Sequence, residues 1–567
     1  MKKKITKSGK IAIASALAIA LTLGTISVTG ITGCGSDQTE VSAKEAPPDG
    51  GPGGTPPDGA PGGAPPDGAS GGAPGGAPGA DASNISWSGA TEITDSGNYS
   101  DKTYSSTTAD QNALLVTGNA TFDGITVEKS GDGESGDAQS FYGTNSGIMV
   151  KDGAKVTIKN ATINTSANGA NGVFSYGGSA TTGNSSSDGT TVTISDSKIS
   201  TTGDGSGGIM TTGGGITKAS NLTVNTSGRS SAAIRTDRGG GTVTVDGGTY
   251  TTSGMGSPTI YSTADITVSN ATLTSNTSEG VCIEGTNSVT LNNCNLTASN
   301  NRKNGNAQYL DSIMIYQSFS GDAAGTGSQF TMKGGTLNSK SGHVFHVTNT
   351  NATINLNDVS INNSDSEDVL LSVVNDGWSG TDNKATVNAT SQNLSGKIIV
   401  SNTASSASSS SSSLTLNLDS ASTFTGSIGD ENGSGSALGT VDVTLDGVWT
   451  LTADSYVTSI SGSGIIDYNG HTLYVGGTAY TSGSPGGSIT NGSVSKETVT
   501  AETGYQIQYS TSKSFKKKTT KTVTKKQMNR IIKTLKNKKK TYYYRTRTYE
   551  TVNGKTTYGK WSKKKKC

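Results

Sequence analysis

The sequence predicts an all-β fold, namely a parallel β-helix followed by a small β domain. A hydrophobic-Thr-hydrophobic phrase recurs along the middle of the 567-residue chain, and after a short bend a second short apolar-polar phrase follows it. Uninterrupted copies are about 23 residues apart, and a fixed period of this size is typical of a solenoid. The copies begin at Val156, Val192, Val243, Ile266, Val289 and Phe330.

The residues within each copy favour strands rather than helices. Apolar and polar residues alternate with period two, and Val, Ile and Thr are frequent. The bends carry Asn, Asp, Ser or Gly, as at Ser195-Asp196 and Asp246-Gly247, which tolerate tight turns and left-handed backbone. No stretch of 3.6-residue periodicity interrupts these copies, which argues against a leucine-rich horseshoe. We therefore expect a β-helix over residues 84–480, with successive rungs roughly 4.8 Å apart.

Composition agrees with a solenoid. Hydrophobic residues make up only 31% of the chain, below the roughly 45–50% of ordinary globular domains. A β-helix tolerates this composition because one narrow core runs along its axis while turns form its flanks. Disorder is the alternative explanation for such a composition. The regular spacing of Val and Ile between Ile85 and Tyr480 argues against it.

The N-terminal segment resembles a bacterial lipoprotein signal. Residues 2–10 are basic, residues 11–28 are almost wholly apolar or small, and Ile31-Thr32-Gly33-Cys34 matches a lipobox. The resemblance implies a signal peptide over residues 1–33, cleavage before Cys34 and lipidation of Cys34. An uncleaved anchor or an ordinary secretory signal is the alternative. We expect a protein held by lipid at the extracellular face of the bacterial cytoplasmic membrane, in the cell envelope.

A Gly/Pro-rich stalk is expected over residues 34–83. The chain repeats Pro-Pro-Asp-Gly and Gly-Gly-Ala-Pro between residues 46 and 80, and such a segment cannot bury a core. Collagen is the competing interpretation, but the glycines do not keep a strict third-residue period. The segment would therefore lift the β-helix off the membrane.

The C-terminal segment, residues 504–567, differs in kind and follows a linker expected at 481–503. The order of Gly504-Tyr505, Phe515, Ile531 to Leu535, Tyr542 to Arg547 and Tyr558 to Ser562 resembles the later strands of a fibronectin type III domain. The first two strands of such a domain are not evident, so the resemblance implies an incomplete β-sandwich.

The charge of this segment is a separate signal. Between Lys513 and Lys566, eighteen Lys and three Arg face only Glu550, a net charge of roughly +20, whereas the whole chain carries +1. Anionic cell-wall polymers such as teichoic acids, or acidic polysaccharide, are the expected partners. No nucleic acid is expected as a partner of an exported protein. A solubilising lysine coat is the alternative.

The β-helix itself resembles the pectate-lyase-like superfamily, which contains polysaccharide lyases, glycosidases and non-catalytic adhesins. Fold alone does not choose among them. The resemblance implies that a lyase would need an acidic cluster for calcium and a basic residue, and that a glycosidase would need paired carboxylates on neighbouring rungs.

Aligning the rungs on their strands predicts a ladder of outward side chains that would bind a sugar. Aromatic faces with interleaved hydrogen-bonding groups are what a sugar-binding groove requires. Ordinary decoration of a sheet surface is the alternative. The predicted ladder consists of Arg235, Tyr261, Glu284, Tyr316 and His346.

A catalytic set is the rival hypothesis for the same region. Arg235 with Asp237 could hold a uronate or supply a lyase base, and Glu284 with Asp311 could act as acid and base. The positions that would match Asp237 on the following rungs carry Thr263 and Thr286, which weakens a calcium-dependent lyase. A local salt bridge between Asp237 and a flanking Arg explains the pattern more simply.

Metal and disulfide signals are weak. The acidic loop of residues 131–137 could bind calcium but lacks the spacing of known calcium loops. The chain has no CxxC motif and only three His, so we expect no zinc or other metal site. A bridge between Cys282 and Cys294 is possible but not favoured.

The prediction as a whole is a lipid-anchored, adhesin-like surface protein that binds carbohydrate or cell-wall polymers through a β-helix face. It has no cofactor, with calcium left as a possibility. A β-helix polysaccharide lyase or glycoside hydrolase is the alternative from another class, and a purely structural wall component is the third.

Overall fold

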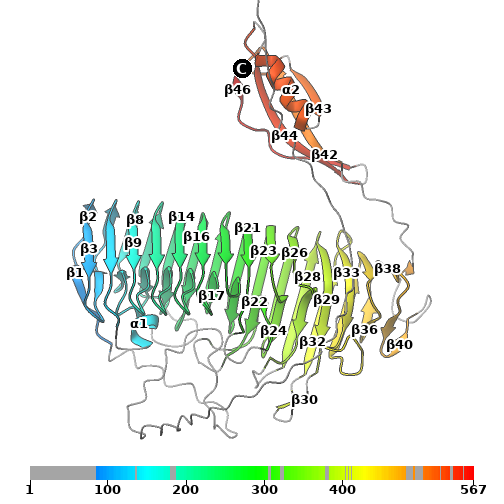
Figure 1. Ribbon diagram of the computed structural model, residues 1–567, viewed down its shortest axis with the longest axis horizontal. Helices are drawn as coiled ribbons and strands as arrows, with labels where there is room; N and C mark the ends of the chain where they lie inside the picture. Colours follow the sequence, from blue (N-terminus) through cyan, green and yellow to red (C-terminus); the bar gives the residue numbers. More distant parts are fainter. Residues whose placement is uncertain are drawn as a thin grey trace, which may run out of the picture. The chain divides into compact units, whose positions relative to one another are not determined.

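A computed structural model describes most of the chain from residue 85 onward, and it confirms the all-β prediction. The described residues are 85–133, 137–178, 187–303, 308–318, 323, 325–376, 382–402, 404–405, 408–409, 411–480, 490–491, 502–516, 518–523, 525–536, 540–552 and 555–566. The described residues between 85 and 480 form a right-handed parallel β-helix whose strands succeed one another along the axis in chain order (Figure 1).

Two large parallel sheets form the wall of the β-helix. Sheet A has 16 strands and receives one strand from each rung, whereas sheet B has 20 strands and receives one long strand or two short ones. The strands of sheet A are β1 (Gly89–Ile93), β4 (Asn112–Val116), β7 (Ile148–Val150), β10 (Val173–Tyr176), β13 (Ile209–Thr212), β15 (Ile234–Thr236), β17 (Ile260–Ser262), β20 (Val281–Glu284), β22 (Asp311–Tyr316), β24 (His343–Thr348), β27 (Val369–Val373), β29 (Asn393–Val400), β33 (Thr423–Gly429), β35 (Val448–Leu451), β38 (Ile465–Asp467) and β41 (Thr490–Asn491).

Sheet B contains the repeated phrases found in the sequence. Its strands are β2 (Gly97–Ser100), β3 (Thr103–Ser106), β5 (Ala120–Asp123), β6 (Thr126–Lys129), β8 (Lys155–Lys159), β9 (Thr162–Thr165), β11 (Thr191–Ser195), β12 (Lys198–Thr201), β14 (Gly215–Thr226), β16 (Gly241–Thr252), β18 (Asp265–Ser269), β19 (Thr272–Ser275), β21 (Ser288–Ala298), β23 (Ser328–Ser339), β25 (Asn351–Asn357), β26 (Ser360–Asn363), β28 (Asn383–Thr390), β32 (Ser412–Leu418), β34 (Thr440–Leu445) and β37 (Ser459–Ser461).

A few short elements lie outside these sheets. The helix α1 (Asp137–Tyr142) belongs to a loop between rungs. The remaining strands are the hairpin β30 (Ala404–Ser405) and β31 (Ser408–Ser409) and the small sheet of β36 (Ser455–Val457), β39 (Leu473–Val475) and β40 (Thr478–Ala479).

The bends in sheet B have the backbone that their residues predict. Asp196, Asn221, Asn270 and Asn293 have φ between 51° and 58°, the left-handed region that Asn and Asp tolerate best after Gly. Their side chains also bond from rung to rung. Asn221 Nδ2 donates to Asp196 Oδ1 at 2.7 Å, and Asn293 Nδ2 donates to Asn270 Oδ1 at 3.0 Å. The bends therefore stabilise the stacking of rungs as well as the turn within each.

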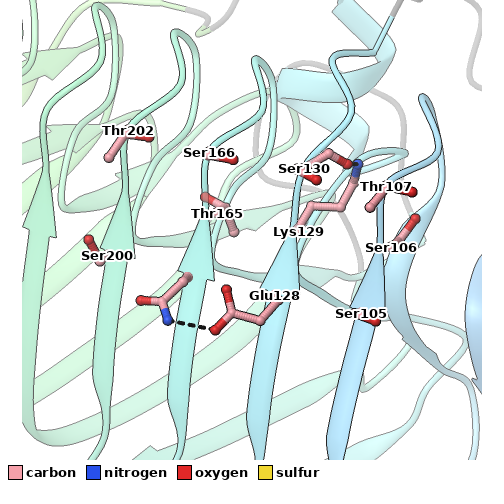
Figure 2. Close-up of a pocket in the computed structure, with 11 residues that line it drawn as sticks. Ser105, Ser106, Thr107, Glu128, Lys129, Ser130, Thr165, Ser166, Ser200 and Thr202 are labelled. Atoms are coloured by element: carbon pink, nitrogen blue, oxygen red, sulfur yellow. Dashed lines mark hydrogen bonds between the residues drawn. The ribbon is translucent and has the colours of Figure 1, made fainter.

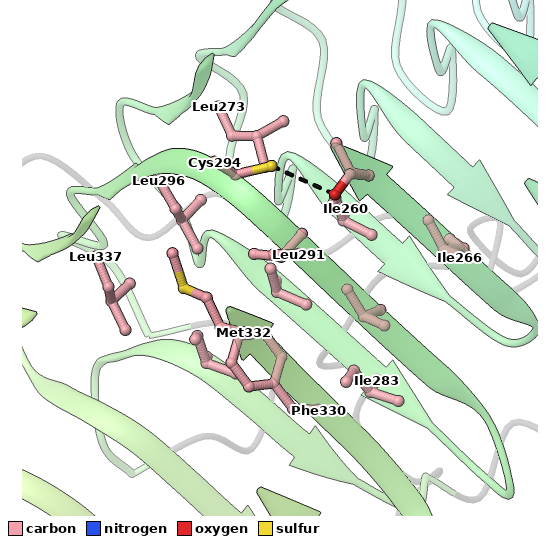
Figure 3. Close-up of a cluster of buried hydrophobic side chains, with 14 of the residues drawn as sticks. Ile260, Ile266, Leu273, Ile283, Leu291, Cys294, Leu296, Phe330, Met332 and Leu337 are labelled. Carbon is pink, nitrogen blue, oxygen red and sulfur yellow. Dashed lines mark hydrogen bonds between the residues drawn. The ribbon is translucent and has the colours of Figure 1, made fainter. Parts of the chain in front are cut away.

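The core is a stack of inward side chains from successive rungs. In register, Leu273 lies beside Leu296 and Leu296 beside Leu337, so the same inward position repeats along the axis (Figure 3). Cys294 belongs to this core, and its Sγ lies 3.4 Å from the Val268 carbonyl oxygen. Cys282 lies outside this core, and both cysteines are buried and free, so they form no bridge with each other.

The C-terminal residues form a unit that corrects one prediction. Its strands β42 (Glu502–Ser510), β43 (Thr519–Val523), β44 (Tyr543–Val552), β45 (Lys555–Tyr558) and β46 (Lys565–Lys566) make one antiparallel sheet. The described residues therefore form a single sheet with a helix, not the two facing sheets of a fibronectin-like sandwich.

The helix α2 (Lys525–Lys536) occupies the segment that was expected to be strand. Its apolar residues Met528, Ile531, Ile532 and Leu535 follow helical spacing, and Leu535 is buried. The polar residues between them and the lysines on both sides obscure this period. The spacing of the apolar residues, not the density of charge, decides the local structure.

The predicted signal peptide, Cys34 and the stalk lie outside the described residues. Within the described part of the chain, no helix has both the length and the apolar character needed to span a membrane. The range predicted as linker includes β41, which pairs with β38.

Candidate functional site

The predicted ladder lies on the outer face of sheet A, but its register is different. Arg235 aligns with Tyr261, which aligns with Cys282 and then Met314 and His346. Glu284 instead aligns with Tyr316, two positions further along their strands. The prediction of one five-membered ladder is therefore wrong. The sequence could not decide, because a shift of two residues keeps every side chain on the same face.

The members of this predicted ladder are also buried. Relative exposure is 2% for Arg235 and Tyr261, 1% for Tyr316 and 0% for Glu284 and His346. The expectation of an exposed aromatic face is therefore wrong. Aromatic and charged residues occur here because a second layer of chain covers the outer face of sheet A from β4 to β27.

Side chains from loops between rungs make up this covering layer. Phe141 of α1 stacks on Arg235 and Arg238, with 5.5 Å and 4.3 Å from the guanidinium carbon to the ring centroid. Further toward the C-terminal rungs, Tyr309 lies over His343 and His346 of β24, with ring centroids 4.9 Å and 5.4 Å apart. Toward the N-terminal rungs, an apolar cluster joins α1 to outward side chains of sheet A, and it comprises Leu115, Phe141, Tyr142, Met149, Phe174, Tyr176 and Met210.

Arg235 and Asp237 form the local salt bridge that was the simpler explanation for their spacing. Arg235 Nη2 lies 3.0 Å from Asp237 Oδ2, and both side chains are buried. Arg235 Nη1 also donates to the Ser230 carbonyl at 3.1 Å, and Asp237 Oδ1 accepts from the Arg238 backbone N–H. These contacts hold the two residues in place and leave neither as an exposed catalytic base.

Glu284 is likewise held by neighbours. Tyr261 donates its hydroxyl to Glu284 Oε2 at 2.7 Å, and the Ser318 backbone N–H donates to Oε1 at 3.2 Å. The Ser318 hydroxyl donates to the same oxygen. The carboxylate therefore links sheet A to the loop that covers it.

Asp311 lies in a separate buried cluster of acids and histidines. Burial raises the pKa of Asp311 well above its usual range, and the nearby carboxylates of Glu279 and Asp376 add to the shift. Burial also raises the pKa of Glu279. Asp311 Oδ1 is fully enclosed without a hydrogen-bond partner among the described residues. Glu284, which the sequence paired with Asp311, is not among the groups that shift the pKa of Asp311.

One histidine of this cluster, His343, is held neutral. Burial lowers the pKa of His343 to about 3, and the neighbouring His346 lowers it further. The Nδ1 atoms of His343 and His346 both lie 2.7 Å from the Ser372 hydroxyl, and His346 Nε2 lies 3.3 Å from Asp376 Oδ2. In the described part of the chain, no three His, Cys, Asp or Glu side chains are arranged to hold a metal ion. The acidic loop predicted as a possible calcium site lies partly outside the described residues.

An open groove lies elsewhere, on sheet B near the N-terminal end of the β-helix. Its volume is about 220 Å³, and it crosses β3, β6, β9 and β12 (Figure 2). Ser105, Glu128, Asn164 and Ser200 align in register along its floor. Asn164 Nδ2 donates to Glu128 Oε1 at 2.9 Å. The wall consists of Ser130, Ser166, Thr107 and Thr202, so nearly every group is a hydroxyl or an amide.

Lys129 lines this groove but its ammonium group is occupied. Its Nζ donates to the backbone carbonyls of Thr108, Ser130 and Gly131 at 3.0, 2.5 and 2.9 Å, which accounts for all three N–H donors. Burial lowers its pKa to about 8, although Asp110 and Asp132 oppose the shift. In the same inward row, Thr165 bonds a loop carbonyl in the same way. Lys129 therefore fastens a loop and offers the groove no free donor.

The groove can hydrogen-bond a polyol but lacks the groups for hydrolysis. Glu128 is the one carboxylate among its lining residues, whereas glycoside hydrolysis requires a pair. Sequence reasoning missed this site because Ser, Thr and Asn occur on nearly every outward position. The one local signal was Lys129, a charge at an inward position that other rungs give to Thr or Ser.

Comparison of the chain with known protein families, curated proteins and solved structures finds no match.

Proposed function

We propose that this chain is a lipid-anchored, adhesin-like surface protein that binds carbohydrate through the outer face of sheet B. The observation that carries the proposal is the open groove, in which hydroxyl, amide and carboxylate groups stand in register at the rung spacing. An extended polysaccharide presents hydroxyl groups at regular intervals, and a row of fixed donors and acceptors suits such a ligand.

The charge of the groove favours a neutral sugar. Glu128 contributes a carboxylate, and the ammonium group of Lys129 is fully used by carbonyl oxygens. A uronate would meet like charge at Glu128 without a free cation beside it. Neutral glycans are therefore the proposed ligand class of the β-helix.

Other parts of the proposal rest on the sequence. The lipobox-like segment supports lipidation at Cys34 and a place in the bacterial cell envelope, and the repeated strands support kinship with the pectate-lyase-like superfamily. The basic C-terminal residues support attraction to an anionic wall polymer.

A β-helix lyase or hydrolase is the second candidate, favoured by one observation. Glu279 and Asp311 are neighbouring carboxyl groups whose pKa values are both raised, as occurs at many catalytic sites. Their burial argues against it, because an extended polysaccharide must reach the acids that cleave it.

The test is an incubation of the purified chain with insoluble neutral and uronic-acid polysaccharides, with and without calcium. Retained protein and released reducing or unsaturated ends are measured together. We expect retention on a neutral polysaccharide without product, reduced at least about fivefold by Asn164→Ala with Glu128→Ala.

The control is Asn388→Ala, which removes a half-exposed outward asparagine of sheet B outside the groove. Equal loss in the control would show that the groove is not the site. If the chain forms product and Asp311→Asn abolishes it, the adhesin proposal is wrong and the chain is a polysaccharide lyase or hydrolase.

A further inference from the structure

Two rows of polar side chains cross the C-terminal antiparallel sheet and end at arginines. One row runs Thr520, Gln508, Arg545 across β43, β42 and β44, and the other runs Thr522, Gln506, Arg547 in the same direction. Gln508 Nε2 donates to Thr520 Oγ1 at 3.0 Å, and Gln506 Nε2 donates to Thr522 Oγ1 at 3.3 Å. These bonds fix which end of each glutamine amide faces its arginine.

Each glutamine oxygen holds one edge of a guanidinium group. Arg545 Nε and Nη2 donate to Gln508 Oε1 at 3.0 and 2.9 Å, and Arg547 Nε and Nη2 donate to Gln506 Oε1 at 3.0 and 2.8 Å. A guanidinium group has five N–H donors. The glutamine takes two of them along the Nε edge, so the fork formed by Nη1 and the second Nη2 proton points away from it.

Aromatic rings hold the planes of both guanidinium groups. Trp561 lies against both arginines, 4.8 Å from the Arg545 guanidinium carbon and 4.5 Å from that of Arg547. Phe515 covers Arg545 at 5.0 Å, and Tyr558 covers Arg547 at 3.9 Å. We call these five side chains the arginine stack. Both arginines are half-buried, so stacking does not remove them from solvent.

We propose that the arginine stack is a binding site for successive phosphate groups of a polyol-phosphate polymer. An arginine fork matches a phosphate in geometry and charge, and here its orientation is fixed before the ligand arrives. Arg545 and Arg547 are two residues apart on one strand, a spacing of roughly 6.8 Å. A flexible phosphodiester chain can place consecutive phosphates at that spacing.

The charge around the stack favours this ligand over a uronic-acid polymer. Residues 513–566 carry a net charge of roughly +20, and Lys560 and Lys563 to Lys566 flank Trp561 and are exposed. A polyol phosphate carries one charge per short, flexible repeat. A uronan holds its carboxylates on rigid rings, so their spacing and direction adjust less readily to the two forks.

This inference deepens the proposed attraction to an anionic wall polymer. It assigns recognition to two oriented arginines, with the lysines adding only general attraction. If the arginine stack instead only holds the C-terminal residues against the sheet, replacing it would lower the stability of the fold. It would not change which anion the chain binds most tightly.

The experiment compares binding of the full chain to poly(glycerol phosphate) at moderate salt. The charge-conserving variant Arg545→Lys with Arg547→Lys loses the fork and the stacking, and we expect affinity to fall at least about tenfold. The control Lys563→Gln with Lys564→Gln removes two charges outside the stack, and we expect a fall of no more than about threefold. A larger loss of affinity in the lysine control than in the arginine variant would overturn the proposal.

A second measurement avoids the risk that the arginine variant misfolds. In the wild-type chain, poly(glycerol phosphate) should slow phenylglyoxal modification of Arg545 and Arg547 but not of the exposed Arg530 on α2, as read by mass spectrometry. Equal protection of all three arginines, or protection of none, would contradict an oriented site.

Competing ligands complete the test. Polygalacturonate and vesicles containing anionic lipid should bind less tightly and should protect the two arginines less than poly(glycerol phosphate) does. Equal or tighter binding of either would assign the stack to that anion and overturn the phosphate proposal. Binding of neutral polysaccharide by the groove is measured separately, so failure of one proposal leaves the other standing.

Discussion

The outer faces of sheet A and sheet B are formed by strands with the same alternating pattern, but they differ in burial. Sheet B leaves its outward hydroxyl and amide groups in an open groove, with Glu128 exposed. From β4 to β27, sheet A buries its outward side chains, including Arg235 and Glu284, under a second layer of chain. The difference arises in the loops, because those that carry Phe141, Tyr309 and Ser318 lie against sheet A.

This contrast teaches that an unusual outward residue has two opposite meanings in a β-helix. On an open sheet, charged and aromatic residues are surface groups that are free to bind. On a covered sheet, they are the polar contacts that attach the covering layer, and each must then be satisfied. Tyr261 and Glu284 were predicted as ligand-binding residues, and the hydrogen bond between them shows the second meaning.

The largest expected effect comes from breaking the buried ion pair on sheet A. Asp237→Ala leaves the Arg235 guanidinium buried without its carboxylate, and we expect the free energy of unfolding to fall by about 3–5 kcal/mol. Chemical denaturation of the full chain measures this. Lys384→Ala, which breaks a half-exposed pair with Asp382, should cost no more than about 1 kcal/mol. Similar losses in the two variants would mean that sheet A is not covered as described.

A smaller, pH-dependent effect should come from His343. Its pKa is about 3 in the folded protein and about 6.5 when unfolded, so the unfolded chain binds the proton first as the pH falls. The stability that neutral His343 provides is therefore present above pH 6.5 and is lost between pH 6.5 and 3.

Comparison with His343→Gln isolates this effect from other titrating groups, including Glu279, Asp311, Asp365, His346 and Asp376. Between pH 7 and pH 4, the wild type should lose about 3 kcal/mol of unfolding free energy relative to the variant. The difference is read from denaturation curves at each pH. A difference that does not change with pH would contradict the burial of His343.

Much of the fold was predictable from the sequence, whereas the site was not. The repeat of Val156, Val192 and their counterparts predicted parallel strands because burial along one axis demands that alternation. The register of sheet A could not be predicted from the sequence. Val281 and Ile283 are both inward, and alternation alone does not say which of them aligns with the inward residue of the neighbouring strand. Covering loops have no repeat, so nothing local reveals that they bury Tyr316 or His346.

The bends of sheet B should give the smallest effect, and they separate backbone from side-chain contributions. Asn293 has φ of 53° and donates to Asn270 on the preceding rung. Asn293→Gly keeps the left-handed backbone and loses only the exposed hydrogen bond, so we expect a cost below about 1 kcal/mol. Asn293→Val must also adopt a left-handed conformation with a branched side chain, which adds roughly 1–2 kcal/mol. If the two variants unfold at the same denaturant concentration, backbone strain does not set the sequence of these bends. A larger cost for the glycine variant would instead assign the stability of this open face to the asparagine ladder itself.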